Sequence, residues 1–192
     1  MNVKIYDITQ ELFHAKVYPG DVAPTFERTL QIAKQDIVNL TVFQMCAHNG
    51  THIDAPYHFI EDGKRVDQIE LDRFIGDCTV IEHDGDLIAE DVHRIMKFAK
   101  KRVLLKGKAV VTLEAAIAFN QYQVYLIGNE SQTVGPEDAP MAVHLELLGK
   151  DVVLLEGIVL DDIEPGDYWL NAAPINLGGA DGAPCRAVLI QF

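Results

Sequence analysis

The sequence predicts a mixed α/β protein with one central sheet or barrel and helices packed against it. Two observations support this prediction: the first third of the chain is rich in β-forming residues, and the middle alternates short apolar strands with helical patterns. A chain of 192 residues buries about 70% of its unfolded surface on folding, so one core suffices without disulfides. No Pro/Ser-rich linker divides the chain, and we therefore expect a single domain over residues 1–192.

β-Forming residues mark the strands expected in the first third. Val3–Ile8 predicts a first strand, and the Pro-Gly pair within Tyr18–Asp21 predicts a turn after it. Arg28–Ala33 is also β-prone. Asp36–Ala47 is the longest run of this kind, and its many apolar side chains predict a largely buried strand.

Strands and helices alternate in the rest of the chain. Apolar residues at helical spacing predict three helices, over Glu90–Lys100, Thr112–Gln121 and Pro136–Lys150. Thr112 is a plausible N-cap for the second helix. Further strands are expected at Asp77–Glu82, Arg102–Lys106, Val124–Gly128, Asp151–Leu155, Tyr168–Ala172 and Ala187–Phe192. A Gly-rich loop, Asn176–Ala183, precedes the last strand.

Charge and cysteine content narrow the functional class. The chain has 16 Lys+Arg and 29 Asp+Glu, a net charge of −13, which argues against binding to nucleic acid or to anionic membranes. No apolar run approaches the ~20 residues of a membrane-spanning helix, and the N-terminus lacks the apolar stretch of a signal peptide. The three cysteines, Cys46, Cys78 and Cys185, predict reduced core thiols. We therefore expect a soluble, cytoplasmic protein.

Four potential metal ligands fall within one short segment, His48-Asn49-Gly50-Thr51-His52-Ile53-Asp54-Ala55-Pro56-Tyr57-His58. Gly50 and Pro56 disfavour a helix, so we expect an irregular turn that follows the predicted buried strand. Imidazole nitrogens with a carboxylate are typical ligands of zinc or manganese, and Asp54 could bridge two ions. The alternative interpretation is a polar loop whose histidines only form hydrogen bonds.

Two more candidates lie downstream. His144 falls on the third expected helix, and Glu156 follows the apolar strand Asp151–Leu155. A carboxylate buried at a strand end needs a cation or good hydrogen-bond donors. Taken alone, His144 also fits a half-buried helix position, and Glu156 also fits an ordinary loop charge.

The segment 48–58 resembles the His-x-Gly-Thr-His-x-Asp-x-Pro-x-His signature of the cyclase family of metal-dependent hydrolases, which includes bacterial kynurenine formamidase and isatin hydrolase. Other segments resemble family blocks in the same order: Tyr18–Asp21, His144, Leu155–Gly157 and Gly179–Pro184. The resemblance implies a compact domain with a β-barrel-like mixed sheet and flanking helices, of the swivelling β/β/α type. It also implies assembly into dimers or tetramers.

The same resemblance implies a metal centre. It assigns two groups of ligands, His48, His52 and Asp54 for one divalent ion and Asp54, His144 and Glu156 for a second. One or two ions per chain are expected, zinc first and manganese as the alternative. His58 would carry protons without binding metal, and Tyr18 would contact the substrate.

The implied activity is hydrolysis of a C–N bond in a small linear or cyclic amide by metal-activated water, as in the arylformamidase step of tryptophan catabolism. Tyr18 stands where kynurenine formamidase commonly has Trp, and Gly128–Gly135 departs from the loop of many relatives, so substrate choice is the open point. One alternative is a hydrolase or lactonase for another small cyclic or acyl substrate. The other is a metal-stabilised binding protein without turnover.

Overall fold

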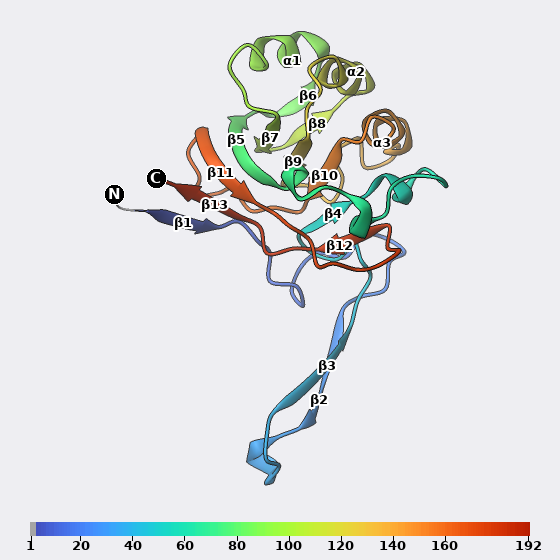
Figure 1. Cartoon of the computed structure of the whole chain (residues 1–192), viewed down its shortest axis with the longest axis vertical. Helices are drawn as coiled ribbons and strands as arrows, with labels where there is room; N and C mark the ends of the chain where they lie inside the picture. The colour runs from blue at the N-terminus through green and yellow to red at the C-terminus, as the bar shows by residue number, and fades with distance from the viewer. Residues whose placement is uncertain (1–2) are drawn as a thin grey trace.

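The computed structural model describes residues 3–192, and its centre is a nine-stranded mixed sheet. In sheet order the strands are β1 (Lys4–Asp7), β13 (Val188–Gln191), β11 (Gly166–Asn171), β5 (Ile75–Glu82), β7 (Arg102–Lys106), β9 (Leu126–Asn129), β10 (Val153–Glu156), β4 (His52–Asp54) and β12 (Gly182–Pro184). The sheet curls into a half-barrel, with helices above it in Figure 1. The predicted mixed α/β fold is confirmed.

Four neighbouring strands, β5, β7, β9 and β10, run parallel, and each connection between them carries one helix. The helices are α1 (Ala89–Ile95), α2 (Leu113–Gln121) and α3 (Met141–Leu148). A small parallel pair, β6 (Gly85–Leu87) and β8 (Ala109–Val111), accompanies the first two connections. Thr112 caps α2 as predicted, because its Oγ1 accepts a hydrogen bond of 3.2 Å from the Ala115 amide.

Apolar side chains cover both faces of the parallel strands. In β7, Val103 and Leu105 belong to the cluster under the three helices, whereas Leu104 belongs to the cluster inside the half-barrel. This alternation follows from the two-residue repeat of a strand. The sheet is therefore the wall between two cores, and it gives β10 a rigid place from which to present a side chain.

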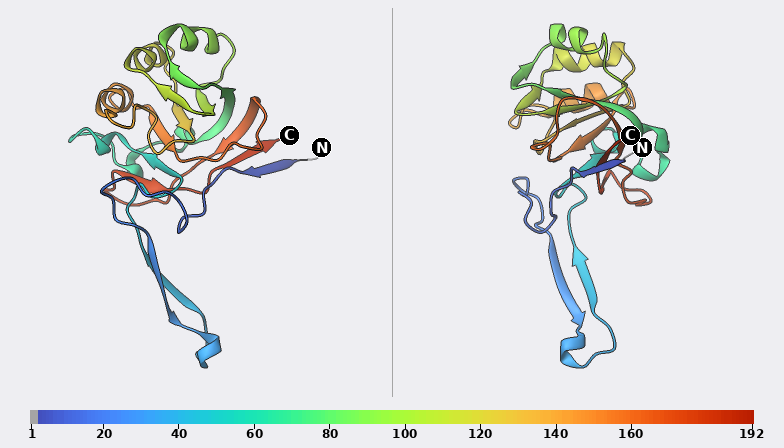
Figure 2. Two further views of the ribbon diagram at one scale, coloured as in Figure 1. Left: turned by 180° about the vertical axis from the view of Figure 1, so that it is seen from behind. Right: turned by 90° about the vertical axis from the view of Figure 1, so that its left-hand side faces the viewer.

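The prediction of a buried strand over Asp36–Ala47 is wrong. β3 (Leu40–Gln44) pairs with β2 (Thr25–Leu30), and all residues of both strands are exposed. A short 3-10 helix, η1 (Ile32–Lys34), lies at the tip of this hairpin, which projects far from the body in Figures 1 and 2. The segment is apolar as the prediction assumed, but the two-stranded hairpin projects away from the sheet and helices that could have buried its side chains.

The remaining differences are local. α3 begins after Pro140, so the expected helix over Pro136–Lys150 lacks its first turn. Single-turn 3-10 helices lie at η2 (Pro56–His58), η3 (Val66–Gln68) and η4 (Leu71–Arg73). All three cysteines are free, and Cys78 and Cys185 are buried as expected, but Cys46 is only half-buried. Over residues 3–192, no helix is both long enough and apolar enough to span a membrane.

Leu104→Ala should lower the free energy of unfolding by about 2–5 kcal/mol, because it leaves a cavity where β7 is fully buried. Chemical denaturation followed by circular dichroism measures this loss. Leu71→Ala, at a side chain that is 63% exposed, is the control and should change the stability by much less. Equal losses in the two variants would contradict the assignment of the inner core.

Candidate metal centre

The centre is built on β4, which lies between β10 and β12. His52 stands opposite Glu156 in β10, and Asp54 stands opposite Gly182 in β12. Because side chains of a strand alternate, His52 and Asp54 point to the same side as Glu156. The irregular turn expected for the whole segment is confined to residues 47–51; the chain is then extended in β4 and turns into the 3-10 helix η2, which carries His58.

Backbone contacts fix the turn that carries His48. Gly50 adopts a φ of +66°, a conformation that favours glycine. The Thr51 hydroxyl donates a hydrogen bond of 2.5 Å to the Gly157 carbonyl and accepts one of 2.9 Å from the Gln10 amide. These bonds join the turn to the end of β10, so His48 is placed relative to the strand that ends in Glu156.

Two histidines are held in a defined tautomer. Nδ1 of His52 lies 2.9 Å from the Gly50 carbonyl, and Nδ1 of His144 lies 2.9 Å from the Pro140 carbonyl. A carbonyl only accepts hydrogen bonds, so each Nδ1 carries the proton. In a neutral ring, the lone pair is then on Nε2, the nitrogen that faces the carboxylates. This is the usual arrangement of histidines that bind a metal.

The donor atoms converge on the two carboxylates. Nε2 of His52 lies 3.3 Å from Asp54 Oδ1 and 3.7 Å from Glu156 Oε2. Nε2 of His144 lies 3.3 Å from Glu156 Oε1 and 3.6 Å from Asp54 Oδ2. Among the described residues, the possible ion sites include His48, His52 and Asp54 as one group and Asp54, His144 and Glu156 as another. The resemblance to the cyclase family implied both groups, and Asp54 belongs to each of them.

Because the cluster is buried, negative charge on its carboxylates is costly in free energy. Asp54 is 1% exposed and Glu156 is 3% exposed. Burial favours protonation of Asp54, but hydrogen bonds from His144, His48 and His52 outweigh it and hold its pKa well below the usual range. Burial and the charge of Asp54 raise the pKa of Glu156. Two adjacent buried carboxylates thus require positive charge beside them.

The buried carboxylates raise the pKa values of the neighbouring histidines. Burial opposes the charge on His48, yet hydrogen bonds to Asp181 and Asp54 outweigh it and raise its pKa to about 11. Burial likewise opposes the charge on His144, and Asp54 and Glu156 raise its pKa to about 10. Protons on these rings supply the positive charge that the carboxylates need. A divalent cation would supply the same charge to lone pairs already directed at it, so the donor set fits a metal.

A cavity of about 190 Å³ opens above the cluster. Its lining residues are Tyr18, Asp21, His48, His52, Asp54, His58, Phe59, Gln132, Thr133, Pro140, His144 and Glu156. Tyr18 lies in this wall, and its hydroxyl donates a hydrogen bond of 3.3 Å to the Glu137 carbonyl. Every site residue predicted from the sequence thus borders the same cavity.

The loop over Gly128–Gly135 contributes both to the cavity wall and to the packing of the fold. Gln132 and Thr133 face the cavity, whereas the Glu130 carboxylate accepts hydrogen bonds from the amides of Gly107 (2.7 Å) and Leu160 (2.8 Å). Glu130 therefore secures the loop to its neighbours. The side chains of this loop that can reach a substrate are Gln132 and Thr133.

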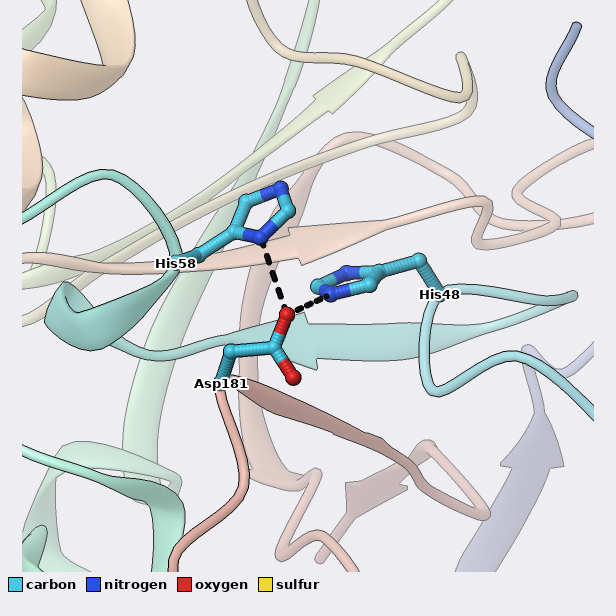
Figure 3. A group of neighbouring side chains, drawn as sticks. All are labelled: His48, His58 and Asp181. Atoms are coloured by element: carbon cyan, nitrogen blue, oxygen red, sulfur yellow. Dashed lines mark hydrogen bonds and ion pairs between the residues drawn. The ribbon is translucent and has the colours of Figure 1, made fainter. Parts of the chain in front are cut away.

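His58 lies on η2, at the edge of the cavity, next to a residue that sequence reasoning missed. Asp181 Oδ2 lies 3.2 Å from His58 Nδ1 and 3.0 Å from His48 Nε2 (Figure 3). Burial lowers the pKa of His58 and favours its neutral form. Asp181 lies 133 residues beyond His48, in a Gly-rich loop, and the only signal was that its segment resembled a family block.

The comparisons with known proteins agree with this geometry. The Cyclase family model, described as "Putative cyclase", matches residues 6–144. Kynurenine formamidases are 33% identical in Erythrobacter litoralis (98% of this chain, 94% of that protein) and 34% identical in Geobacillus thermodenitrificans (95% of each).

Solved structures show the same fold. A potential metal-dependent hydrolase with cyclase activity has a TM-score of 0.85 and 25% identity over 100% of this chain and 99% of that one. Isatin hydrolase A from Labrenzia aggregata has a TM-score of 0.83 and 22% identity over 98% of this chain and 93% of that one. Sequence, fold and site lead to one conclusion: the chain belongs to the Cyclase family, together with the kynurenine formamidases.

Proposed function

We propose that this protein is a metal-dependent hydrolase that cleaves the C–N bond of a small amide, with an aryl formamide such as N-formylkynurenine as its substrate. One observation carries the proposal: two groups of metal donors share Asp54 at the floor of a cavity that also exposes His58. The kynurenine formamidases, at 33–34% identity over nearly the whole chain, supply the substrate class.

The proposed ligands are those that the sequence suggested. His48, His52 and Asp54 would hold one divalent ion, and Asp54, His144 and Glu156 would hold a second. Zinc suits these nitrogen and oxygen donors, and manganese is the alternative. When bound, the ion supplies Lewis acidity, which lowers the pKa of its water from 15.7 to about 7 and polarises a carbonyl. The protein supplies the donor geometry and the cavity above it.

His58 is the proposed proton carrier. Its lowered pKa keeps the ring neutral near pH 7, so one ring nitrogen is free to accept a proton from the attacking water. An amide nitrogen leaves poorly unless it is protonated, and His58 would deliver that proton. The ring of Tyr18 in the cavity wall would contact the aryl part of the substrate.

The exposed hairpin supports assembly into a homo-oligomer. We infer that the hairpin packs against a second copy of the chain, because it exposes a set of large apolar side chains that the body does not cover: Phe26, Leu30, Ile32, Ile37, Val38, Leu40, Val42 and Phe43. A two-stranded ribbon is marginally stable alone, so a partner surface would also stabilise it. The three free cysteines fit the proposed cytoplasmic location.

The zinc-loaded protein should hydrolyse N-formylkynurenine, and His58→Ala should retain the metal but lose about 10²–10⁴-fold in kcat. Product formation followed by absorbance, with metal content by mass spectrometry, measures both. His93→Ala is the control, because His93 lies at the surface and contacts Tyr122.

A metal-loaded protein inactive on formamides but active on a panel of cyclic amides or lactones would identify the alternative substrate class. Inactivity on the whole panel would contradict the proposal and favour a binding protein. Loss of metal as the main effect of His58→Ala would make His58 a ligand.

Asp54→Ala should empty both ion sites, because both groups of donors include this carboxylate. Metal stoichiometry after dialysis should fall from one or two ions per chain to near zero. Asp62→Ala, at an exposed carboxylate outside the cavity, is the control and should bind metal normally. Normal metal content in Asp54→Ala would refute the shared ligand.

Light scattering coupled to size-exclusion chromatography should give a mass of at least two chains. The double variant Val42→Asp/Phe43→Asp should shift the protein toward the mass of one chain, because it places charges on the exposed apolar hairpin. Lys34→Asp, on η1 at the tip, is the control for charge alone. A wild-type protein that elutes as a single chain would contradict the proposed assembly.

A further inference from the structure

The Asp181 side chain connects two histidines that the proposed function places in different roles. Its Oδ2 lies 3.0 Å from Nε2 of His48 and 3.2 Å from Nδ1 of His58. The two imidazole rings stack, with centroids 4.0 Å apart and planes inclined by 30°. Figure 3 shows both dashed contacts ending on the same oxygen. One carboxylate oxygen therefore sets the orientation of both rings.

The chemistry of a carboxylate determines where the ring protons are. An ionised carboxylate only accepts hydrogen bonds, so His48 donates from Nε2 and His58 donates from Nδ1. In the neutral rings, the lone pairs are then on the opposite nitrogens. For His48 that nitrogen is Nδ1, 2.8 Å from Asp54 Oδ1; without an ion it also donates, as the raised pKa of His48 indicates, and binding of the proposed ion would replace this proton. For His58 it is Nε2, which becomes the proton-accepting atom.

The loop around Asp181 is held close to His48. A Cβ atom on Gly182 would lie 2.5 Å from Cε1 of His48, so only glycine permits this approach. The Asp181 carbonyl accepts a hydrogen bond of 2.9 Å from the Ala55 amide, directly after β4. Asp181 is therefore fixed to the strand that carries Asp54, although 127 residues separate the two in sequence.

A third ion held by His48, His58 and Asp181 would use the same atoms, which are close enough to share one. That arrangement conflicts with the proposed site, because a neutral imidazole has one lone pair and His48 uses it on the side of Asp54. A second ion on Nε2 would need an imidazolate. Asp181 is also 43% exposed, whereas Asp54 is 1% exposed, so water already screens its charge.

From this geometry we propose that Asp181 is a positioning residue that fixes the tautomers of His48 and His58 together. Carboxylates beside metal-bound histidines orient the ring in this way, and their loss costs about 10–100-fold in metal affinity or activity. Here one carboxylate also acts on the proton carrier. The inference rests on the proposed function for its kinetic consequence, but its structural consequence is measurable without a substrate.

The test compares Asp181→Asn and Asp181→Ala with Asp67→Asn. Asp67 is a matched control, because its Oδ1 accepts a hydrogen bond of 2.9 Å from the Gly179 amide and so anchors the same loop. In zinc-saturated protein, long-range ¹H–¹⁵N spectra should show His58 protonated on Nδ1 in the wild type and in Asp67→Asn. Both Asp181 variants should lose that single tautomer and keep the same number of zinc ions.

With the formamide substrate, the Asp181 variants should lose about 10–100-fold in kcat, with KM changed by less than about threefold. In a His58→Ala background at saturating zinc, the same substitutions should lower kcat by less than about threefold, because the kinetic effect of Asp181 passes through His58 and its effect on His48 is one of zinc affinity.

Three results would overturn the inference: loss of a zinc ion from Asp181→Asn at saturating zinc, an equal kinetic loss in Asp67→Asn, or an unchanged His58 tautomer in Asp181→Ala. A wild type with no activity on any amide or lactone would refute the proposed function instead, and the zinc and tautomer measurements would still decide the role of Asp181.

Discussion

The centre of this protein depends on two carboxylates, Asp54 and Glu156, that are buried side by side. Each would be costly alone, and together they repel one another: burial, and then the charge of Asp54, raise the pKa of Glu156. The imidazole rings of His48, His52 and His144 surround the two carboxylates, and their nitrogens lie 2.8–3.7 Å from the carboxylate oxygens. A site that must gather positive charge in this way is prepared for a divalent cation.

Most of the proposed metal ligands lie on strands and a helix, which are rigid elements of the fold. Glu156 ends a strand buried on both faces, and β4 places His52 and Asp54 beside it through antiparallel pairing. The helix α3 contributes His144, whose ring is fixed by a carbonyl one turn earlier. Residues proposed to meet the substrate or move protons come instead from η2 and from loops at the edge of the cavity. The division suits a hydrolase, because ligands must stay fixed while the rim adapts to different substrates.

Sequence patterns predicted what depends on local repetition or short spacing. The short apolar stretches within Arg102–Lys106 and Val124–Gly128 predicted two strands, which the structure pairs in parallel, and the crowded ligands between His48 and His58 predicted a metal centre. The exposure of the strand within Asp36–Ala47 could not be predicted, because a run of apolar side chains has the same pattern in a covered strand and in an uncovered one. Asp181 was missed for a different reason: its link to His48 exists only after β12 pairs with β4.

The central claim is that a divalent ion lies between these buried carboxylates and the Nε2 atoms of His52 and His144. Anomalous diffraction from zinc-soaked crystals, recorded on both sides of the zinc absorption edge, tests it most directly. The account predicts one or two anomalous peaks within about 2.0–2.2 Å of those nitrogens and of Asp54 or Glu156 oxygens. Well-ordered side chains of Asp54, Glu156, His52 and His144 with no anomalous peak among them would contradict the claim.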